Sequence, residues 1–83
     1  MEIEFDPAKD AANITKHGIS LSRAADFELV ARIEDERFYE PRIRAYGWID
    51  GDPYCLAYLI RDGSIRAISL RRAHLKEFRR HAP

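Results

Sequence analysis

The spacing of apolar and polar residues predicts helices in the first part of the chain. Asp6, Pro7 and Gly18 have the positions of an N-cap, a first helical residue and a residue just past a helix end. At about 100° per residue, this helix gathers a polar face that consists of Lys9, Asn13, Lys16 and His17. Ser20 is expected to cap a second helix, which continues to about Leu29.

The pattern changes to that of β-strands after the acidic segment 33–36. An alternating stretch, a turn, a continuous apolar run, a second turn and a further strand follow one another, at residues 41–49, 50–53, 54–60, 61–63 and 64–70. Two tight connections imply an antiparallel meander, and the unbroken run predicts a central strand covered on both faces. A short helix from about Arg71 to Arg80, anchored by Leu75 and Phe78, is expected to follow.

With a short alternating stretch at residues 3–6, these elements predict the order β-α-α-β-β-β-α, an α+β fold with a small antiparallel sheet. At 83 residues, the chain is expected to form one domain, 1–83, with a single core. The single cysteine, Cys55, lies within the apolar run, which favours a buried thiol in a reducing cytoplasm. The apolar stretches are too short for a membrane helix, and the N-terminus is acidic, so no membrane association or export is expected.

Charge is divided unevenly along the chain, although the formal net charge is zero. Residues 1–60 hold 7 basic and 12 acidic side chains, whereas residues 61–83 hold 7 basic and 2 acidic ones. This asymmetry favours an anionic partner for the C-terminal part, with nucleic acid as the first candidate. Mutual pairing of the two parts on one surface is the alternative.

One strand of the predicted meander combines arginine with aromatic residues on a single face, namely Arg42, Arg44, Tyr46 and Trp48. Such a face is suited to base stacking and phosphate contact. Arginine and aromatic residues are also enriched where one protein covers another. The sequence therefore leaves both RNA and a partner protein open for this face.

The candidate chemistry is free of metal and cofactor. His17, His74 and His81 lack the i, i+3 or i, i+4 spacing of helical metal ligands, and no glycine-rich phosphate loop or serine elbow is present. Histidine, lysine, arginine and glutamate remain, and these suffice for RNA cleavage because the substrate carries its own 2′-hydroxyl nucleophile. His17 and Glu40 are the candidates for proton transfer. The alternative is that the polar helix face is simply solvated.

One set of residues matches a known family in order and spacing: Asp6, Pro7, Lys9, Asn13, Lys16, His17 and Gly18, then Ser69, Arg71, Arg72 and Ala73. This set, which spans nearly the whole chain, resembles the BrnT toxins of type II toxin–antitoxin systems. The resemblance implies a RelE-like fold and a metal-independent endoribonuclease activity that arrests growth. It also implies a cognate BrnA-like antitoxin, which binds the toxin in a hetero-oligomer and provides the only link to DNA.

Carried over to the matching positions, the resemblance implies a set of catalytic candidates: Lys16, His17, Glu40, Arg42, Arg71 and Arg72. The RNA contacts are expected from the polar helix face, the arginine and aromatic strand face and the basic end: Lys9, Asn13, Arg44, Tyr46, Trp48, Arg66, Lys76 and Arg79. A helix that begins by Arg71 would turn this residue toward the body and Arg72 outward. The sequence does not decide which group is the general base and which is the general acid. It also leaves open the alternative that the chain is a non-catalytic RNA- or protein-binding module of the same fold.

Overall fold

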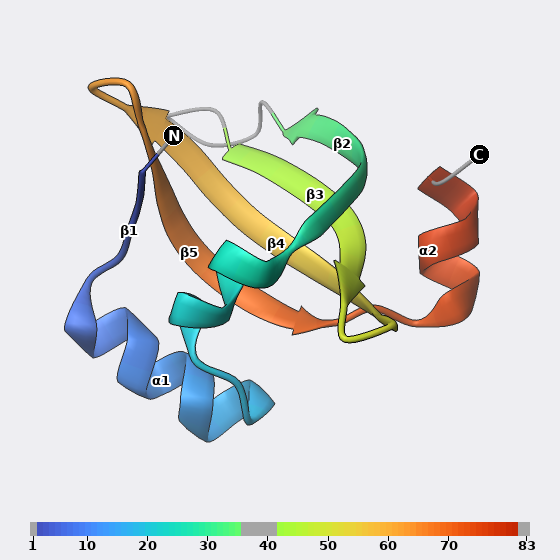
Figure 1. The fold of residues 1–83 in the computed structure, drawn as a ribbon, viewed down its shortest axis with the longest axis horizontal. Helices are drawn as coiled ribbons and strands as arrows, with labels where there is room; N and C mark the ends of the chain where they lie inside the picture. Colours follow the sequence, from blue (N-terminus) through green and yellow to red (C-terminus); the bar gives the residue numbers. More distant parts are fainter. Residues whose placement is uncertain (1, 36–41, 82–83) are drawn as a thin grey trace.

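The computed structural model describes residues 2–35 and 42–81, which form an α+β domain (Figure 1). Its elements in chain order are β1 (Ile3–Glu4), α1 (Pro7–His17), the 3₁₀ helix η1 (Leu21–Asp26), β2 (Glu28–Asp35), β3 (Arg42–Ile49), β4 (Asp52–Arg61), β5 (Ser64–Arg72) and α2 (Leu75–His81). In this part of the chain, no helix is long and apolar enough to cross a membrane.

The strands form one five-stranded mixed sheet in the order β1-β5-β4-β3-β2. Strands β3 to β5 are antiparallel neighbours, which confirms the predicted meander; β2 adds a further antiparallel strand beside β3, and β1 pairs in parallel with β5 at Ile65 and Arg66. The sheet is therefore larger than predicted and is not purely antiparallel.

The predicted second helix ending near Leu29 is wrong, and with it the order β-α-α-β-β-β-α. Ser20 does act as an N-cap, but the helix that follows is a 3₁₀ helix of 6 residues. The chain is already extended at Glu28 and pairs with β3 along β2. The register shifts between Leu29 and Ala31, so a bulge interrupts the two-residue alternation by which a strand is recognised in a sequence.

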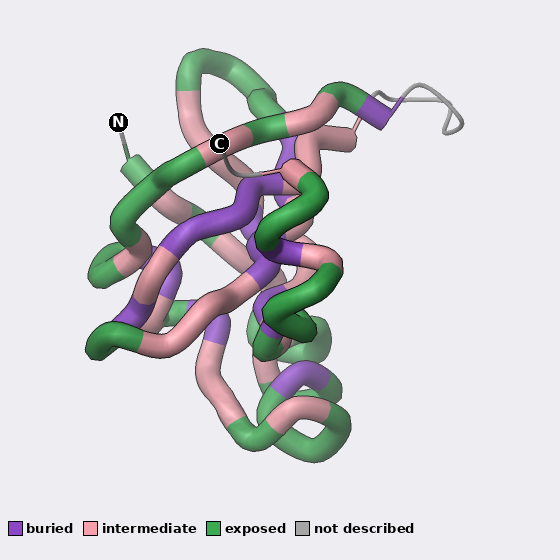
Figure 2. The backbone as a smooth tube through the Cα atoms, turned by 90° about the vertical axis from the view of Figure 1, so that its right-hand side faces the viewer, coloured by how far each residue is buried: buried purple, intermediate pink, exposed green. Residues whose placement is uncertain are grey.

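Each face of the sheet has its own apolar core. On one face, Ala45, Leu56 and Leu70 pack with η1 residues Leu21 and Ala24. The opposite face holds a smaller cluster, in which Tyr46, Cys55 and Ala73 are covered by Phe78 of α2. Strand β4 contributes to both clusters, which confirms that it is a central strand covered on both faces. Buried positions accordingly follow the strands, while much of α1 and α2 is exposed (Figure 2).

The C-terminal helix begins at Leu75, because β5 continues through Arg72. Leu75 is 53% exposed, so the prediction that it anchors the helix is wrong, whereas Phe78 is a buried anchor as predicted. The Phe78 ring lies 6.4 Å from that of Tyr46 and 4.6 Å from that of Trp48 between centroids. Tyr46 is 0% exposed beneath this helix, so the prediction of Tyr46 as a base-stacking residue is wrong.

Candidate functional site

Helix α1 is attached to the sheet through a polar residue. Asn13 is 5% exposed, and its Nδ2 donates to the carbonyl oxygens of Leu70 (2.8 Å) and Ile19 (2.9 Å), while its Oδ1 accepts from the Leu70 amide (3.0 Å). The side chain thus takes the place of a neighbouring strand at the β5 edge, beyond the point where β1 stops pairing. The side-chain amide of Asn13 is committed to the backbone, so the structure gives this residue a structural role, and its contact with RNA stays a prediction.

Asn13→Asp is expected to lower the free energy of unfolding by about 3 kcal/mol, because a buried donor becomes an oxygen that faces two carbonyl oxygens. Urea unfolding measures the loss. Thr15→Ala, on the exposed side of the same helix, should change stability by no more than about 0.5 kcal/mol. Equal stability of the wild type and Asn13→Asp would contradict this role for Asn13.

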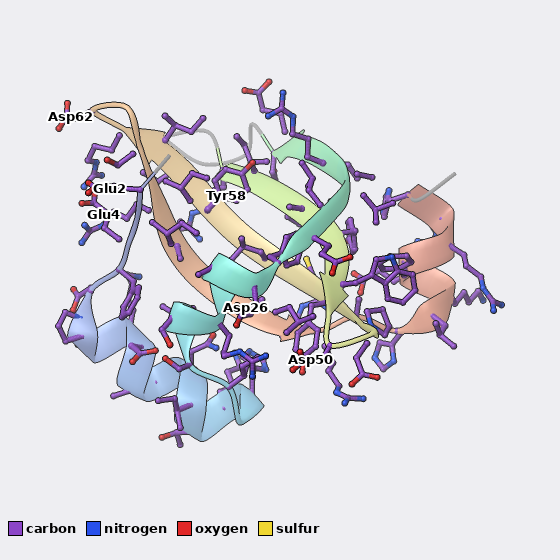
Figure 3. All side chains as sticks on the ribbon, in the orientation of Figure 1. Glu2, Glu4, Asp26, Asp50, Tyr58 and Asp62 are labelled. Atoms are coloured by element: carbon purple, nitrogen blue, oxygen red, sulfur yellow. The ribbon has the colours of Figure 1, made fainter. Side chains whose placement is uncertain are left out.

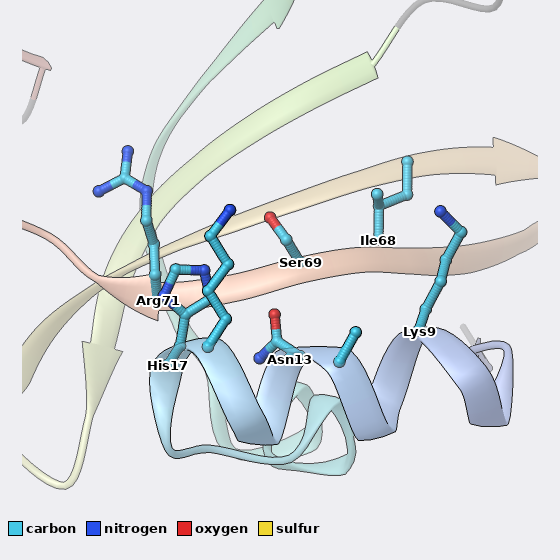
Figure 4. Close-up of a pocket in the computed structure, with 8 residues that line it drawn as sticks. Lys9, Asn13, His17, Ile68, Ser69 and Arg71 are labelled. Carbon is cyan, nitrogen blue, oxygen red and sulfur yellow. The ribbon is translucent and has the colours of Figure 1, made fainter.

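A pocket of about 370 Å³ lies between α1 and β5, and Figure 4 shows that its side chains come from these two elements. Its lining consists of Lys9, Ala12, Asn13, Lys16, His17, Ile68, Ser69 and Arg71. Predicted residues from opposite ends of the sequence therefore meet here. Of the described residues that form the lining, three are cationic and none is acidic. Such a cavity attracts an anion.

His17 is the titratable group of this pocket whose charge changes near neutral pH. It is the last residue of α1, which Gly18 ends in the left-handed conformation at φ 73°. Burial lowers the pKa of His17 below 6.5, and the charges of Lys16 and Arg71 lower it further. The neutral imidazole, which can accept a proton, is therefore the prevailing form at pH 7.

Arg71 is held at the pocket by a carboxylate from α2. Its Nη1 and Nη2 donate to Oε1 and Oε2 of Glu77, each at 2.9 Å, and the Tyr46 hydroxyl donates to Glu77 Oε2 at 3.1 Å. The Arg71 hydrogen bonds lower the pKa of Glu77 to about 2, and burial raises the pKa of Tyr46 to about 12. Glu77 therefore stays a carboxylate and Tyr46 stays a hydroxyl donor throughout the neutral range.

Sequence reasoning missed Glu77. The sequence feature that could have pointed to Glu77 is that it is the one acidic residue between Arg66 and His81. A lone carboxylate among many cations is well placed to order one of them.

The structure does not bring Arg72 into the pocket. Successive strand residues point to opposite faces, so Arg72 leaves the sheet on the side away from Arg71. Its Nη2 donates to Asp52 at 2.8 Å, its guanidinium lies 5.9 Å from the Tyr54 ring centroid, and its side chain is 68% exposed. Arg71 is thus directed inward and Arg72 outward as predicted, although by strand alternation and not by a helical stripe.

The other predicted residues lie elsewhere. Arg42, Arg44 and Trp48 belong to β3, Arg66 forms an ion pair with Glu4 at 3.7 Å, and Lys76 and Arg79 are exposed on α2. Glu40 lies outside the described residues. Ion pairs between the acidic and basic parts of the chain form at Arg66, which pairs with Glu4, and at Arg72, which pairs with Asp52. Figure 3 shows Glu2, Glu4 and Asp62 beside β1 and the β4–β5 turn.

No group of three or more His, Cys, Asp or Glu side chains in the described part of the chain could hold a metal ion. The fold and the pocket define a small α+β protein with a cationic pocket whose lining includes lysine, arginine and histidine. The fold is that of the Brucella abortus ribonuclease toxin BrnT, whose crystal structure at 1.1 Å aligns with a TM-score of 0.69 over 89% of this chain and 97% of that chain. Sequence identity is 22%, so this likeness concerns the fold.

The family follows from the sequence itself. Residues 5–77 match the family model described as the ribonuclease toxin BrnT of type II toxin–antitoxin systems. The chain therefore belongs to this family of ribonuclease toxins, whose partner is an antitoxin protein and whose substrate is RNA. No curated protein matches the chain in sequence.

Proposed function

We propose that this toxin is a RelE-like endoribonuclease that cleaves RNA without a metal ion, in the pocket between α1 and β5. The observation that carries the proposal is a single pocket that holds His17 together with the cations Lys9, Lys16 and Arg71, of which Lys16 and Arg71 act on the His17 charge. The three cations provide a binding site for a phosphate, and the neutral imidazole provides a base beside it. RNA uses both features, because a 2′-hydroxyl lies next to each phosphorus of its backbone.

In the proposed reaction, His17 takes the proton of a 2′-hydroxyl, and the 2′-oxygen attacks the adjacent phosphorus. The new bond from the 2′-oxygen to phosphorus forms as the bond from phosphorus to the 5′-oxygen breaks. Arg71 and Lys16 stabilise the negative charge that develops on the phosphate oxygens. The departing 5′-oxygen takes up a proton, which the imidazolium can return. The products are a 2′,3′-cyclic phosphate end and a 5′-hydroxyl end.

The partner in this proposal is a cognate BrnA-like antitoxin in the same cytoplasm. An antitoxin neutralises this chemistry most directly by covering the pocket, and it would supply the only contact with DNA. The exposed cations Arg72, Lys76 and Arg79 lie outside the pocket. They are suited to attract the RNA backbone over a distance, in a salt-dependent manner.

Cleavage of a short RNA in the presence of EDTA tests the proposal. Purified toxin is expected to cleave with the chelator present and to leave cyclic phosphate ends, which mass spectrometry of the fragments identifies. Cleavage that stops with EDTA and returns with Mg²⁺ would contradict metal independence. Binding of RNA without cleavage would favour the non-catalytic module. Expression in bacteria provides the cellular measurement, because an active toxin should arrest growth and its antitoxin should restore it.

A further inference from the structure

Glu77 contacts the pocket arginine without lining the pocket. Its carboxylate receives both Nη groups of Arg71 at 2.9 Å, and the two side chains are only 33% and 25% exposed. Surface ion pairs usually contribute little to stability, because their side chains adopt many geometries. This pair is bidentate, partly buried and bonded to the Tyr46 hydroxyl, so the orientation of the guanidinium is restricted.

The arrangement leaves one edge of the Arg71 guanidinium for a ligand. Of its five N–H groups, two donate to Glu77 and one Nη1 group donates to the Arg72 carbonyl at 3.2 Å. Covalent geometry places the remaining Nε and outer Nη2 donors side by side. Within the described residues, no acceptor is bonded to this edge. Two parallel donors match two oxygens of a phosphate.

We propose that Glu77 is a positioning residue for RNA cleavage, holding the end of the Arg71 guanidinium so that its free edge receives the phosphate. The inference rests on the proposed function of the pocket. It makes α2 a part of the site, although α2 contributes no described residue to the pocket lining. The opposite role, a carboxylate that competes with phosphate for Arg71, would require α2 to move away.

The packing of α2 favours the positioning role over competition. Phe78 is buried against Tyr46 and Trp48, and the His81 ring stacks on Tyr46 with 4.8 Å between centroids. Glu77 therefore projects from a helix that is anchored at the next residue and again one turn further on. A carboxylate fixed in this way can orient Arg71 without leaving when a phosphate enters.

Glu77→Gln preserves the shape of the side chain and removes its charge. We expect kcat for cleavage of a short RNA to fall about tenfold, because the guanidinium loses its fixed orientation. Affinity for a non-cleavable 2′-O-methyl copy of the same RNA should stay equal or increase, because a negative charge leaves the surroundings of a polyanion. Glu28→Gln removes the same charge from the exposed end of β2 and should keep kcat within about twofold.

The same substitution in an Arg71→Ala background separates positioning from a general structural role. If Glu77 acts through Arg71, Glu77→Gln lowers kcat no further in this background. The inference would be overturned if Glu77→Gln lowered kcat just as much in the Arg71→Ala background. It would also be overturned if the single variant lost kcat, RNA affinity and thermal stability together, or if its kcat were unchanged or higher.

The NMR signals of the Arg71 Nη groups give a readout that does not depend on cleavage. Bonded Nη groups should give separate signals in the wild type, and these should average in Glu77→Gln; separate signals in both proteins would overturn the positioning role. Absence of cleavage by the wild type would instead overturn the proposed function, so the two failures can be told apart.

Discussion

His17→Ala is expected to reduce kcat for RNA cleavage by a factor of about 10²–10⁴, the usual contribution of a positioned general base. The loss should fall on kcat more than on RNA affinity, because Lys9, Lys16 and Arg71 still surround the pocket. Single-turnover cleavage together with binding of a 2′-O-methyl RNA measures the two effects separately. His74→Ala is the matched control, because His74 is exposed and does not line the pocket, and its kcat should stay within about twofold.

The pH dependence tests the same assignment. A base acts in its neutral form, so kcat/KM should rise with pH through the pKa of His17 in the free enzyme. This pKa lies below 6.5, because burial, Lys16 and Arg71 all disfavour the imidazolium. The midpoint of the acidic limb should therefore lie below pH 6.5 and should move upward in Lys16→Ala. A midpoint above pH 6.5 in the wild type, or an acidic limb that persists in His17→Ala, would contradict this role.

Local signals in the sequence predicted those elements whose residues carry strong local preferences. Asp6, Pro7 and Gly18 gave the bounds of α1 correctly, and the turn residues gave β3, β4 and β5. Strand β2 was missed because the bulge disrupts its alternation and its exposed residues give no apolar stripe. The start of α2 was misplaced because Arg71 and Arg72 are compatible with either a helix or a strand, and pairing with β4 decides between them.

The candidate site shows the same division between local and long-range information. The sequence placed Lys9, Lys16 and His17 on one face of α1, and the structure turns that face toward β5. Asn13 belongs to the same face but is buried, because only the tertiary fold brings the Leu70 backbone to its amide. Glu77 could not be assigned a role for a similar reason, since its partner lies on a different element of the structure.

Arg71 and Arg72 differ by one position, and their replacement should have very different consequences. Arg71→Ala is expected to lower kcat/KM for RNA cleavage by a factor of about 10²–10³, the range for removal of one donor to a developing negative charge. Arg71→Lys should recover only part of this loss, because an ammonium cannot replace the bidentate fork. Arg72→Ala should lower kcat/KM by no more than about threefold and should mainly weaken its salt dependence, as expected for an exposed cation outside the pocket.

Folding must be separated from chemistry in the Arg71 variants, because Arg71→Ala also leaves Glu77 without its ion pair. Urea unfolding of both variants provides the correction, and Arg71→Lys keeps a positive charge near the Glu77 carboxylate. A variant that is folded but inactive places Arg71 in the chemistry. Equal losses in Arg71→Ala and Arg72→Ala would instead show that only the overall positive charge matters, and strand alternation at the end of β5 would then have no part in catalysis.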